Sequence, residues 1–372
     1  MKKILQLSSD FQYQKLYPNL VRGLSQQDIG QIVFLQTRGN EPYVELDDIK
    51  NVSIVQTFQH RLWMKFLFKK RITALKSSIQ NSVNLAEVSL TVAYFLFTDG
   101  AVANELYKQN GTPFIVAIRN SDVNHYFKYR FWLKGYIKEV MTNASKIIFP
   151  SPSYIKATKD IVGDAFYSKI IHNKIEIVGN IIDDAWFDGV TAKEPPNSEI
   201  NIIYAGEFSK NKRLDAVISS FRLFTKKNTA RLFLVGNYGD YVDKIVKLAE
   251  PYENIHIIDK VDCVRNLISI FDKCHILVMP SKTETFGNAY IEAMARGLPI
   301  VYSKGQGVDG YFEDGEVGFP VSPPLDRSIL ESLENILKDY SNLSRNAIEG
   351  SMSFTKGAIV KKYIDIFNKV KK

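Results

Sequence analysis

Short runs of β-branched and other apolar residues alternate with longer stretches of helical periodicity along almost the whole chain. In the first half, the expected strands are 2–8, 31–37, 112–119, 145–151 and 174–180. In the second half they are 200–208, 230–237, 254–261, 274–281, 298–305 and 317–322. Most of these runs end in Gly, Ser or Asn, which suit the turn from a buried parallel strand into a helix. The alternation predicts right-handed β-α-β units, and therefore an α/β fold with doubly wound parallel sheets.

The length of the chain, 372 residues, favours two domains over a single hydrophobic core. Pro195 and Pro196 lie in a polar segment just before a new strand, which is typical of a domain boundary. We expect a first domain over 1–190, a second over 197–352, and a C-terminal helix over 353–372 that packs back on the first domain. Ligands bind at the carboxyl ends of the strands in such domains, so the cleft between the two is the expected active site.

The composition, 45% hydrophobic and 24% charged residues, is that of a soluble globular protein. Cys263 and Cys274 each lie beside an apolar run, which favours two buried free thiols in a reducing compartment. The N-terminal residues make a poor signal peptide, and no apolar run approaches the ~20 residues that a membrane-spanning helix needs. We therefore expect a cytoplasmic protein without a membrane anchor.

The net charge of +8 is concentrated in one window, because seven basic residues and no acidic one lie between Asp48 and Glu87. On a helical wheel Arg61, Lys65 and Lys69 share one face. One interpretation is an amphipathic helix on a sheet, with solvated lysines. The other is peripheral contact with the anionic inner face of the cytoplasmic membrane, which would suit a lipid-linked acceptor. A nucleic-acid partner is not expected, since no nucleic-acid-binding fold accompanies this modest charge.

Residues 281–297, SKTETFGNAYIEAMARG, follow a buried strand and lead into a helix. The backbone amides of Phe286, Gly287, Asn288 and Ala289 should therefore project from a helix N-terminus at the carboxyl end of a strand. That arrangement suits a phosphate or diphosphate, and glycine at 287 leaves room for its approach.

Glu284 lies before this helix and Glu292 lies one to two turns inside it. Ionised carboxylates accept hydrogen bonds in pairs, and vicinal sugar hydroxyls are natural donors for them. One glutamate for each sugar, with phosphates between them, describes a nucleotide-sugar. Two alternatives are that both are acids favoured by the helix dipole, or that they are the acid/base pair of a glycoside hydrolase.

Glu284 and Glu292, with Phe286-Gly287 between them, resemble the signature of family-4 glycosyltransferases, which have the GT-B fold. The segments AGEFSKNKRLDAV, LFLVGNYGDY and GVDGYFEDGEVGFPV follow in the order and spacing of that family. The resemblance implies two Rossmann-like domains that face a central cleft, and retention of anomeric configuration. It also implies that no metal is required, and the sequence has no evident Asp-X-Asp motif.

The resemblance also implies roles for single residues. Glu284 would hold the hydroxyls of the donor sugar, Glu292 the nucleotide ribose, and Lys212 the diphosphate, where it opposes charge on the leaving nucleotide. Gly206 and Gly236 would shape the nucleotide pocket, although turn glycines need no function.

Two positions depart from the family. Glu207 stands where an arginine is usual, and Lys210 or Arg213 would have to replace that cation. Arg119 stands where many members have a histidine, and it cannot act as a base.

Asp122 matches the acidic residue of the same motif, so Arg119 and Asp122 join the catalytic candidates. A surface ion pair or an Asx turn explains these two residues equally well. Asp10, in the first loop after a strand, is a candidate acceptor contact.

The predicted activity is hexosyl transfer from a UDP- or GDP-sugar to a saccharide or lipid-linked acceptor, in bacterial capsule, lipopolysaccharide or glycolipid biosynthesis. No cofactor is expected beside the nucleotide-sugar. The alternatives are a catalytically silent subunit that binds nucleotide-sugar or lipid, and a nucleotide-sugar hydrolase or phosphorylase with the same fold.

Overall fold

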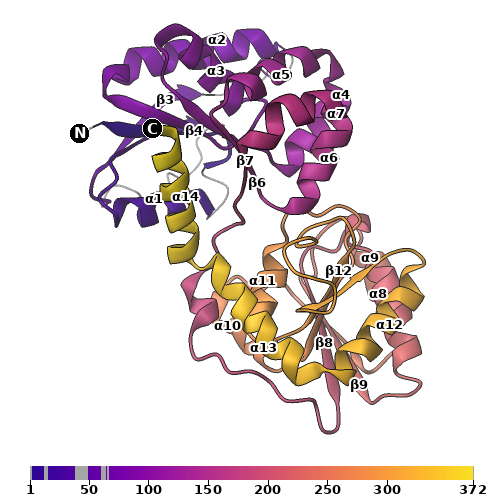
Figure 1. Ribbon diagram of the computed structural model, residues 1–372. Coiled ribbons are helices and arrows are strands. Elements are labelled where there is room, and N and C mark those ends of the chain that lie inside the picture. Colours follow the sequence, from indigo (N-terminus) through magenta and orange to yellow (C-terminus); the bar gives the residue numbers. More distant parts are fainter. Residues whose placement is uncertain (1, 12–15, 38–48, 60–63, 65–66, 372) are drawn as a thin grey trace. The chain divides into compact units, whose positions relative to one another are not determined.

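A computed structural model describes residues 2–11, 16–37, 49–59, 64 and 67–371 (Figure 1). The chain divides into two compact units. Unit 1 comprises residues 1–150, 154–181 and 356–372, and unit 2 comprises 151–153 and 182–355. Each unit is a parallel sheet with helices on its faces, so the fold class is α/β, as the alternation of strands and helices predicts.

In the described part of unit 1, seven parallel strands form a sheet of order β3-β2-β1-β4-β5-β6-β7. The strands are β1 (Lys3–Ser8), β2 (Gln31–Thr37), β3 (Val52–Gln59), β4 (Val88–Ala93), β5 (Phe114–Ala117), β6 (Lys146–Phe149) and β7 (Ile175–Ile177). Its helices of eight residues or more are α1 (Leu16–Ser25), α2 (Phe68–Ser82), α3 (Asp99–Asn110), α5 (Lys134–Asn143), α6 (Pro152–Val162) and α14 (Lys356–Lys371).

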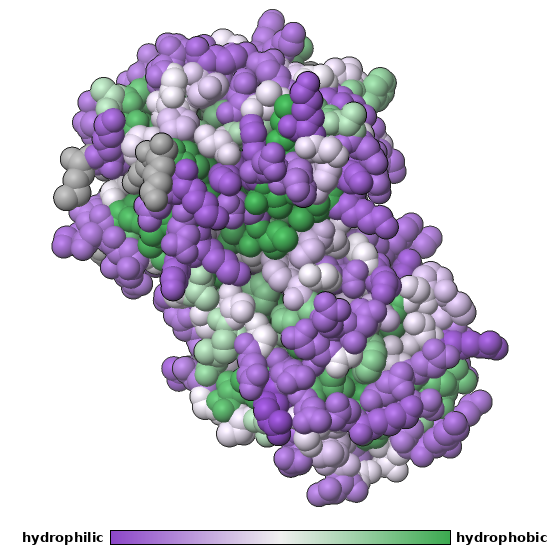
Figure 2. Space-filling view, in the orientation of Figure 1, coloured by the Kyte–Doolittle hydropathy of each residue, from purple (hydrophilic) through white to green (hydrophobic). Residues whose placement is uncertain are grey.

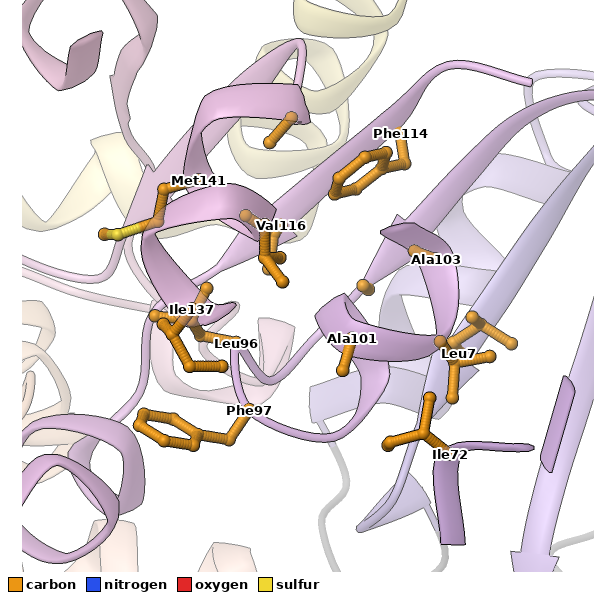
Figure 3. Close-up of a cluster of buried hydrophobic side chains, with 14 of the residues drawn as sticks. Leu7, Ile72, Leu96, Phe97, Ala101, Ala103, Phe114, Val116, Ile137 and Met141 are labelled. Atoms are coloured by element: carbon orange, nitrogen blue, oxygen red, sulfur yellow. The ribbon is translucent and has the colours of Figure 1, made fainter. Parts of the chain in front are cut away.

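Figure 3 shows how the core of unit 1 is assembled from segments far apart in the sequence. Leu7 of β1, Ile72 of α2, Ala101 of α3, Val116 of β5 and Ile137 of α5 are all buried. Alanines in α3 allow this helix to approach the sheet closely, because a larger side chain would have no space in a close-packed interior.

The C-terminal helix α14 packs against α1. Gly23 permits this contact, because a Cβ atom at that position would lie 2.4 Å from Cγ2 of Val360. At the other end of α14, the ammonium of Lys369 donates a 2.9 Å hydrogen bond to Glu176, which also pairs with Lys146. The final helix is therefore part of unit 1 by both packing and charge.

In unit 2, six parallel strands form a sheet of order β10-β9-β8-β11-β12-β13 among the described residues. The strands are β8 (Ile200–Ala205), β9 (Ala230–Val235), β10 (Ile255–Ile258), β11 (Ile276–Met279), β12 (Ile300–Ser303) and β13 (Gly318–Val321). The longer helices are α8 (Leu214–Phe224), α9 (Val242–Ala249), α10 (Val264–Asp272), α11 (Asn288–Ala295), α12 (Leu325–Lys338) and α13 (Tyr340–Ser351).

Three expectations need correction or qualification. The sequence analysis did not predict strands β3 and β4. Strand β3 is a partly exposed edge strand, and β4 is followed directly by further apolar residues. Cys263 is exposed rather than buried, since it caps α10, whereas Cys274 is buried. Arg61 and Lys65 lie outside the described residues, and the described helix of the basic window begins at Phe68.

Hydrophilic residues cover most of the visible face of each unit, with smaller hydrophobic patches between them (Figure 2). Among the described residues, no helix is both long enough and apolar enough to span a bilayer.

Candidate nucleotide-sugar site

The strand order of unit 2 reverses between β8 and β11, which lie side by side with Ile203 opposite Leu277. Ligands of doubly wound sheets bind at the carboxyl ends of the strands at such a switch point. Gly206 follows β8, and the loop that holds Glu284 follows β11. The sheet therefore brings the two most informative sequence motifs to one edge.

Lys212 and Glu284 form a partly buried ion pair at this edge. The Nζ atom of Lys212 lies 2.7 Å from Oε2 of Glu284, and the two side chains are only 19% and 15% exposed. Oε1 of Glu284 accepts a 3.2 Å hydrogen bond from the amide of Thr285. The carboxylate is thus held in one orientation by partners on both of its oxygens.

Asn211 fastens the lysine loop to the glutamate loop. Its Oδ1 atom accepts hydrogen bonds from the amide and the hydroxyl of Thr283, at 3.0 and 2.7 Å, and its Nδ2 atom donates to the carbonyl of Thr283. The amide of Lys282 donates to the carbonyl of Asn211 at 2.7 Å. These four bonds place Lys212 and Glu284 on a common rigid frame.

Gly287 is the N-cap of α11, with φ of +79°, and no side chain caps this helix end. A Cβ atom at 287 would lie 2.4 Å from the ring of Tyr290, so the tyrosine excludes any larger residue. The Tyr290 hydroxyl is fixed by donation to the carbonyl of Met279, at 2.5 Å. Asn288 is exposed and Ala289 is half-buried, while the side chain of Phe286 is buried in the core.

Glu292 lies on α11 and is half-buried. Burial, with a smaller contribution from the neighbouring charge of Asp183, raises the pKa of this carboxyl to about 7. Neither an ion pair nor a hydrogen bond of Glu292 is found within the part of the chain that the structure describes. A buried carboxyl of this kind gains most from a ligand that donates hydrogen bonds to it.

The glycines after β8 and β9 let two loops touch backbone to backbone. A Cβ atom on Gly236 would lie 2.3 Å from the carbonyl oxygen of Gly206, and Gly236 has φ of +114°. This contact requires glycine at 236 whether or not a nucleotide binds there. Between the loops, Glu207 is exposed, and Arg213 adopts a left-handed conformation at the start of α8.

In unit 1, Asp122 is fully buried and serves as a backbone tie. Its carboxylate accepts hydrogen bonds from the amides of Leu96, Phe97 and Arg119, at 3.2, 3.1 and 2.9 Å. Burial nevertheless raises the pKa of Asp122 to about 6. The observed contacts join the loop after β4 to the loop after β5, and a catalytic role for Asp122 stays a prediction.

Arg119 lies after β5 among aromatic side chains. Its Nη1 atom donates a 3.2 Å hydrogen bond to Oδ1 of Asn180, and its guanidinium carbon lies 6.0 Å from the ring centre of Tyr17. Burial raises the pKa of Tyr363 in α14, and the nearby charge of Arg119 opposes this increase. The sequence analysis gave no sign that these two residues are neighbours. The role of Arg119 in the reaction likewise stays a prediction.

The two remaining predicted residues are at separate places in unit 1. Asp10 lies in the loop after β1, where its amide donates a 3.4 Å hydrogen bond to the hydroxyl of Ser8. Lys69 is exposed on α2 and lines a surface cavity of about 320 Å³ together with Lys76 and Tyr136. Within unit 2, the structure pairs Lys212 with Glu284 and places the backbones of Gly206 and Gly236 in contact. The roles of Asp10 and Lys69 stay predictions.

Comparisons with known proteins identify the family that part of this chain matches. Residues 191–352 match the family described as glycosyl transferases group 1. That range contains the ion pair, both glutamates and the glycine loops. Residues 191–352 form a group 1 glycosyl transferase domain. The predicted group 1 glycosyltransferase is thereby confirmed for this part of the chain, which includes Lys212 and Glu284.

The whole chain has relatives of known fold. It superposes on Anabaena HepE in complex with UDP with a TM-score of 0.75, over 99% of this chain and 100% of that one, at 16% identity. It also superposes on a sucrose-phosphate synthase from Thermosynechococcus elongatus with a TM-score of 0.73, over 99% of both chains, at 17% identity. The predicted GT-B fold class is thereby confirmed.

Among curated proteins, the chain is similar to an uncharacterized 41.2 kDa protein in the cps region of Klebsiella pneumoniae, at 23% identity over 65% of this chain and 69% of that protein. It is also similar to the capsular polysaccharide biosynthesis glycosyltransferase CapM of Staphylococcus aureus, at 28% identity over 39% of this chain and 38% of CapM. The match therefore spans well under half of CapM.

Two residues of unit 2 that contact predicted site residues or lie near them were not predicted for the site. Asn211 was not predicted, although it lies within the segment AGEFSKNKRLDAV. An asparagine between two lysines gives no sign that its partner is Thr283, 72 residues away. Asp183 is the other, and its proximity to Glu292 arises from the contact of α11 with the short helix at Asp184–Phe187. The described residues contain no cluster of three or more His, Cys, Asp or Glu able to hold a metal ion.

Proposed function

We propose that this protein is a retaining glycosyltransferase that moves a hexosyl unit from a UDP- or GDP-sugar to a saccharide or lipid-linked acceptor. The proposed setting is bacterial capsule, lipopolysaccharide or glycolipid biosynthesis, at the cytoplasmic side of the membrane. The capsular glycosyltransferase among the relatives and the UDP complex among the structural neighbours support this proposal. Unit 2 would take the donor and unit 1 the acceptor.

The Lys212–Glu284 pair is the observation that carries the proposal. A lysine ammonium has three N–H donors, and Glu284 takes one of them. The others can hold a diphosphate, while Glu284 keeps acceptor capacity for the hydroxyls of the sugar. The pair thus offers a cation for the leaving group beside an acceptor for the transferred sugar, which is what a nucleotide-sugar requires.

The proposed reaction needs one bond exchange at the anomeric carbon. The acceptor hydroxyl oxygen bonds to this carbon on the face from which the diphosphate departs, and the bond from carbon to the phosphate oxygen breaks. The departing phosphate takes the hydroxyl proton. Lys212 opposes the negative charge that builds on the phosphate, and the N-terminus of α11 adds its dipole. No metal is assigned to this step, and Lys210 or Arg213 would supply the cation that Glu207 does not.

The proposed ribose contact predicts a pH dependence. Because the pKa of Glu292 is about 7, about one tenth of these carboxyls are ionised at pH 6 and about nine tenths at pH 8. Ribose hydroxyls donate to the ionised form, so nucleotide binding should strengthen about tenfold as the pH rises through this range. Isothermal titration with UDP and GDP at pH 6, 7 and 8 measures the effect.

Glu292→Gln provides the matched control for this prediction, since an amide does not titrate. The variant should bind more weakly at pH 8 and should lose the extra tenfold dependence, while any titration of the nucleotide itself is common to both proteins. An identical pH profile in the variant and the wild type would refute the ribose role of Glu292.

Release of free nucleoside diphosphate from UDP- and GDP-hexoses tests the proposed activity. The wild-type protein should release it from at least one donor above the level of Lys212→Ala, with EDTA present or absent. If a nucleotide binds but no donor turns over with any saccharide or lipid-linked acceptor, the silent-subunit alternative replaces the enzyme. Arg119 favours this alternative, because it stands where many family members have a histidine and it cannot act as a base.

A further inference from the structure

Residues 128–134, KYRFWLK, form an exposed aromatic-basic segment between the short helix α4 (Phe127–Tyr129) and α5. Phe131, Trp132 and Tyr129 are 71%, 66% and 56% exposed, which makes them the most exposed large hydrophobic side chains of the described residues. A soluble domain gains nothing from leaving three neighbouring aromatic side chains in water. Their exposure therefore indicates a contact that the isolated chain does not provide.

Buried residues hold the backbone of the segment in place on unit 1. Phe127, Leu133 and Ile137 are buried in the core of unit 1, on either side of the exposed residues. Phe131 and Trp132 contact one another edge to face, with ring centres 5.3 Å apart. The aromatic side chains are thus presented by a fixed base, and they need no rearrangement to meet a partner.

The charge around these side chains is uniformly positive in the sequence. Residues 123–138 contain Lys128, Arg130, Lys134 and Lys138 and no acidic residue. The Nζ atom of Lys128 lies 5.3 Å from the ring centre of Tyr129. The complementary surface is therefore one that carries negative charge and also admits aromatic rings.

We infer that the aromatic-basic segment docks unit 1 on an anionic lipid bilayer. Tryptophan and tyrosine favour the headgroup region of a membrane, and basic side chains next to them are attracted to anionic lipids. A second copy of this chain fits less well, because a two-fold interface would place the cations of one segment against those of the other. Single-stranded nucleic acid offers stacking and phosphates but no apolar interior for Phe131.

This inference goes beyond the proposed function and does not depend on the donor site. It differs from the membrane contact predicted around Arg61, Lys65 and Lys69, since it rests on a different segment whose side chains are described. If the acceptor is lipid-linked, the segment would hold the enzyme where that acceptor is found.

Vesicle co-sedimentation of the full chain tests the inference. Wild-type protein should sediment with vesicles of 70% phosphatidylcholine and 30% phosphatidylglycerol, and not with phosphatidylcholine alone. Y129S/F131S/W132S should weaken partitioning at least about thirtyfold. K128Q/R130Q/K134Q should weaken it about a hundredfold and remove its salt dependence, since each cation near an anionic surface contributes a factor of about five.

Matched variants of unit 2 control for general loss of apolar surface or charge. V246S/L248S/M352S removes exposed apolar side chains, and K226Q/K227Q/K247Q removes exposed cations. Both should partition like the wild type. Circular dichroism and the UDP-induced thermal shift should be unchanged in every variant, so that misfolding or loss of the donor site is recognised separately.

Fluorescence of the Trp63→Phe variant provides a second readout, because its two remaining tryptophans are the exposed Trp132 and the buried Trp186. Anionic vesicles should shift the emission of this variant to the blue, and the additional substitution W132F should remove that shift. Wild-type protein left in the supernatant, or binding that survives both segment variants, would overturn the inference. Binding to single-stranded nucleic acid or self-association that requires the segment, without vesicle binding, would also overturn it.

Discussion

Glu284→Gln is expected to lower kcat/KM for the nucleotide-sugar by at least about a hundredfold, while the affinity for the free nucleotide changes less than about threefold. The substitution keeps the shape of the side chain and removes its charge. Hydrogen bonds to a charged group contribute about 1.5–3 kcal/mol each, and the loss of two such bonds to sugar hydroxyls accounts for the expected decrease.

Titration calorimetry and initial rates at saturating acceptor measure the two quantities separately. Glu250→Gln is a suitable control, since this glutamate is exposed at the end of α9. It should leave both quantities unchanged. An equal loss of nucleotide affinity and turnover in Glu284→Gln would contradict the division of labour between Glu284 and Glu292.

Lys212→Ala should reduce kcat by about 10²–10³-fold, which is the usual effect of removing one group that stabilises developing charge in a transition state. It should also reduce the preference for nucleoside diphosphate over nucleoside, because the ammonium is assigned to the diphosphate. Binding of UDP and of uridine to the two proteins measures this preference directly.

Lys226→Ala is the matched control, because Lys226 is an exposed lysine of the same unit, just after the end of α8. We expect a several-fold effect at most. A comparable loss in both variants would indicate a diffuse positive field rather than a specific contact. Full retention of kcat in Lys212→Ala would remove the lysine from the mechanism.

Local pattern predicted much of the fold. Buried parallel strands form continuous apolar runs, so the strands of unit 2 could be read from the sequence, as could the glycine that begins α11. Strand β3 escaped this reasoning, since its polar residues break the apolar run, and β4 escaped because apolar residues continue beyond its end. Helix and strand cannot be separated by periodicity alone in such a run.

The site was predictable in its residue types and not in its contacts. The sequence indicated Glu284 by its place between a buried strand and a helix, and Lys212 through the resemblance to the family. It did not indicate the bond between them or the frame made by Asn211, since both join residues 72 positions apart. Asp122 illustrates the same limit of local patterns, because its carboxylate accepts hydrogen bonds from three backbone amides and two of them are about 25 residues away in the sequence.

Unfolding of the full chain with UDP, GDP, ADP and TDP, each with and without EDTA, tests the central claim most directly. A ligand at 100 times its dissociation constant contributes about 2.7 kcal/mol, which should raise the midpoint of the domain that binds it by about 5–10 °C. We predict such a shift with UDP or GDP, unchanged by EDTA and diminished in Glu292→Gln. The absence of a shift with every nucleotide, or a shift that EDTA abolishes, would contradict a metal-independent nucleotide-sugar site in unit 2.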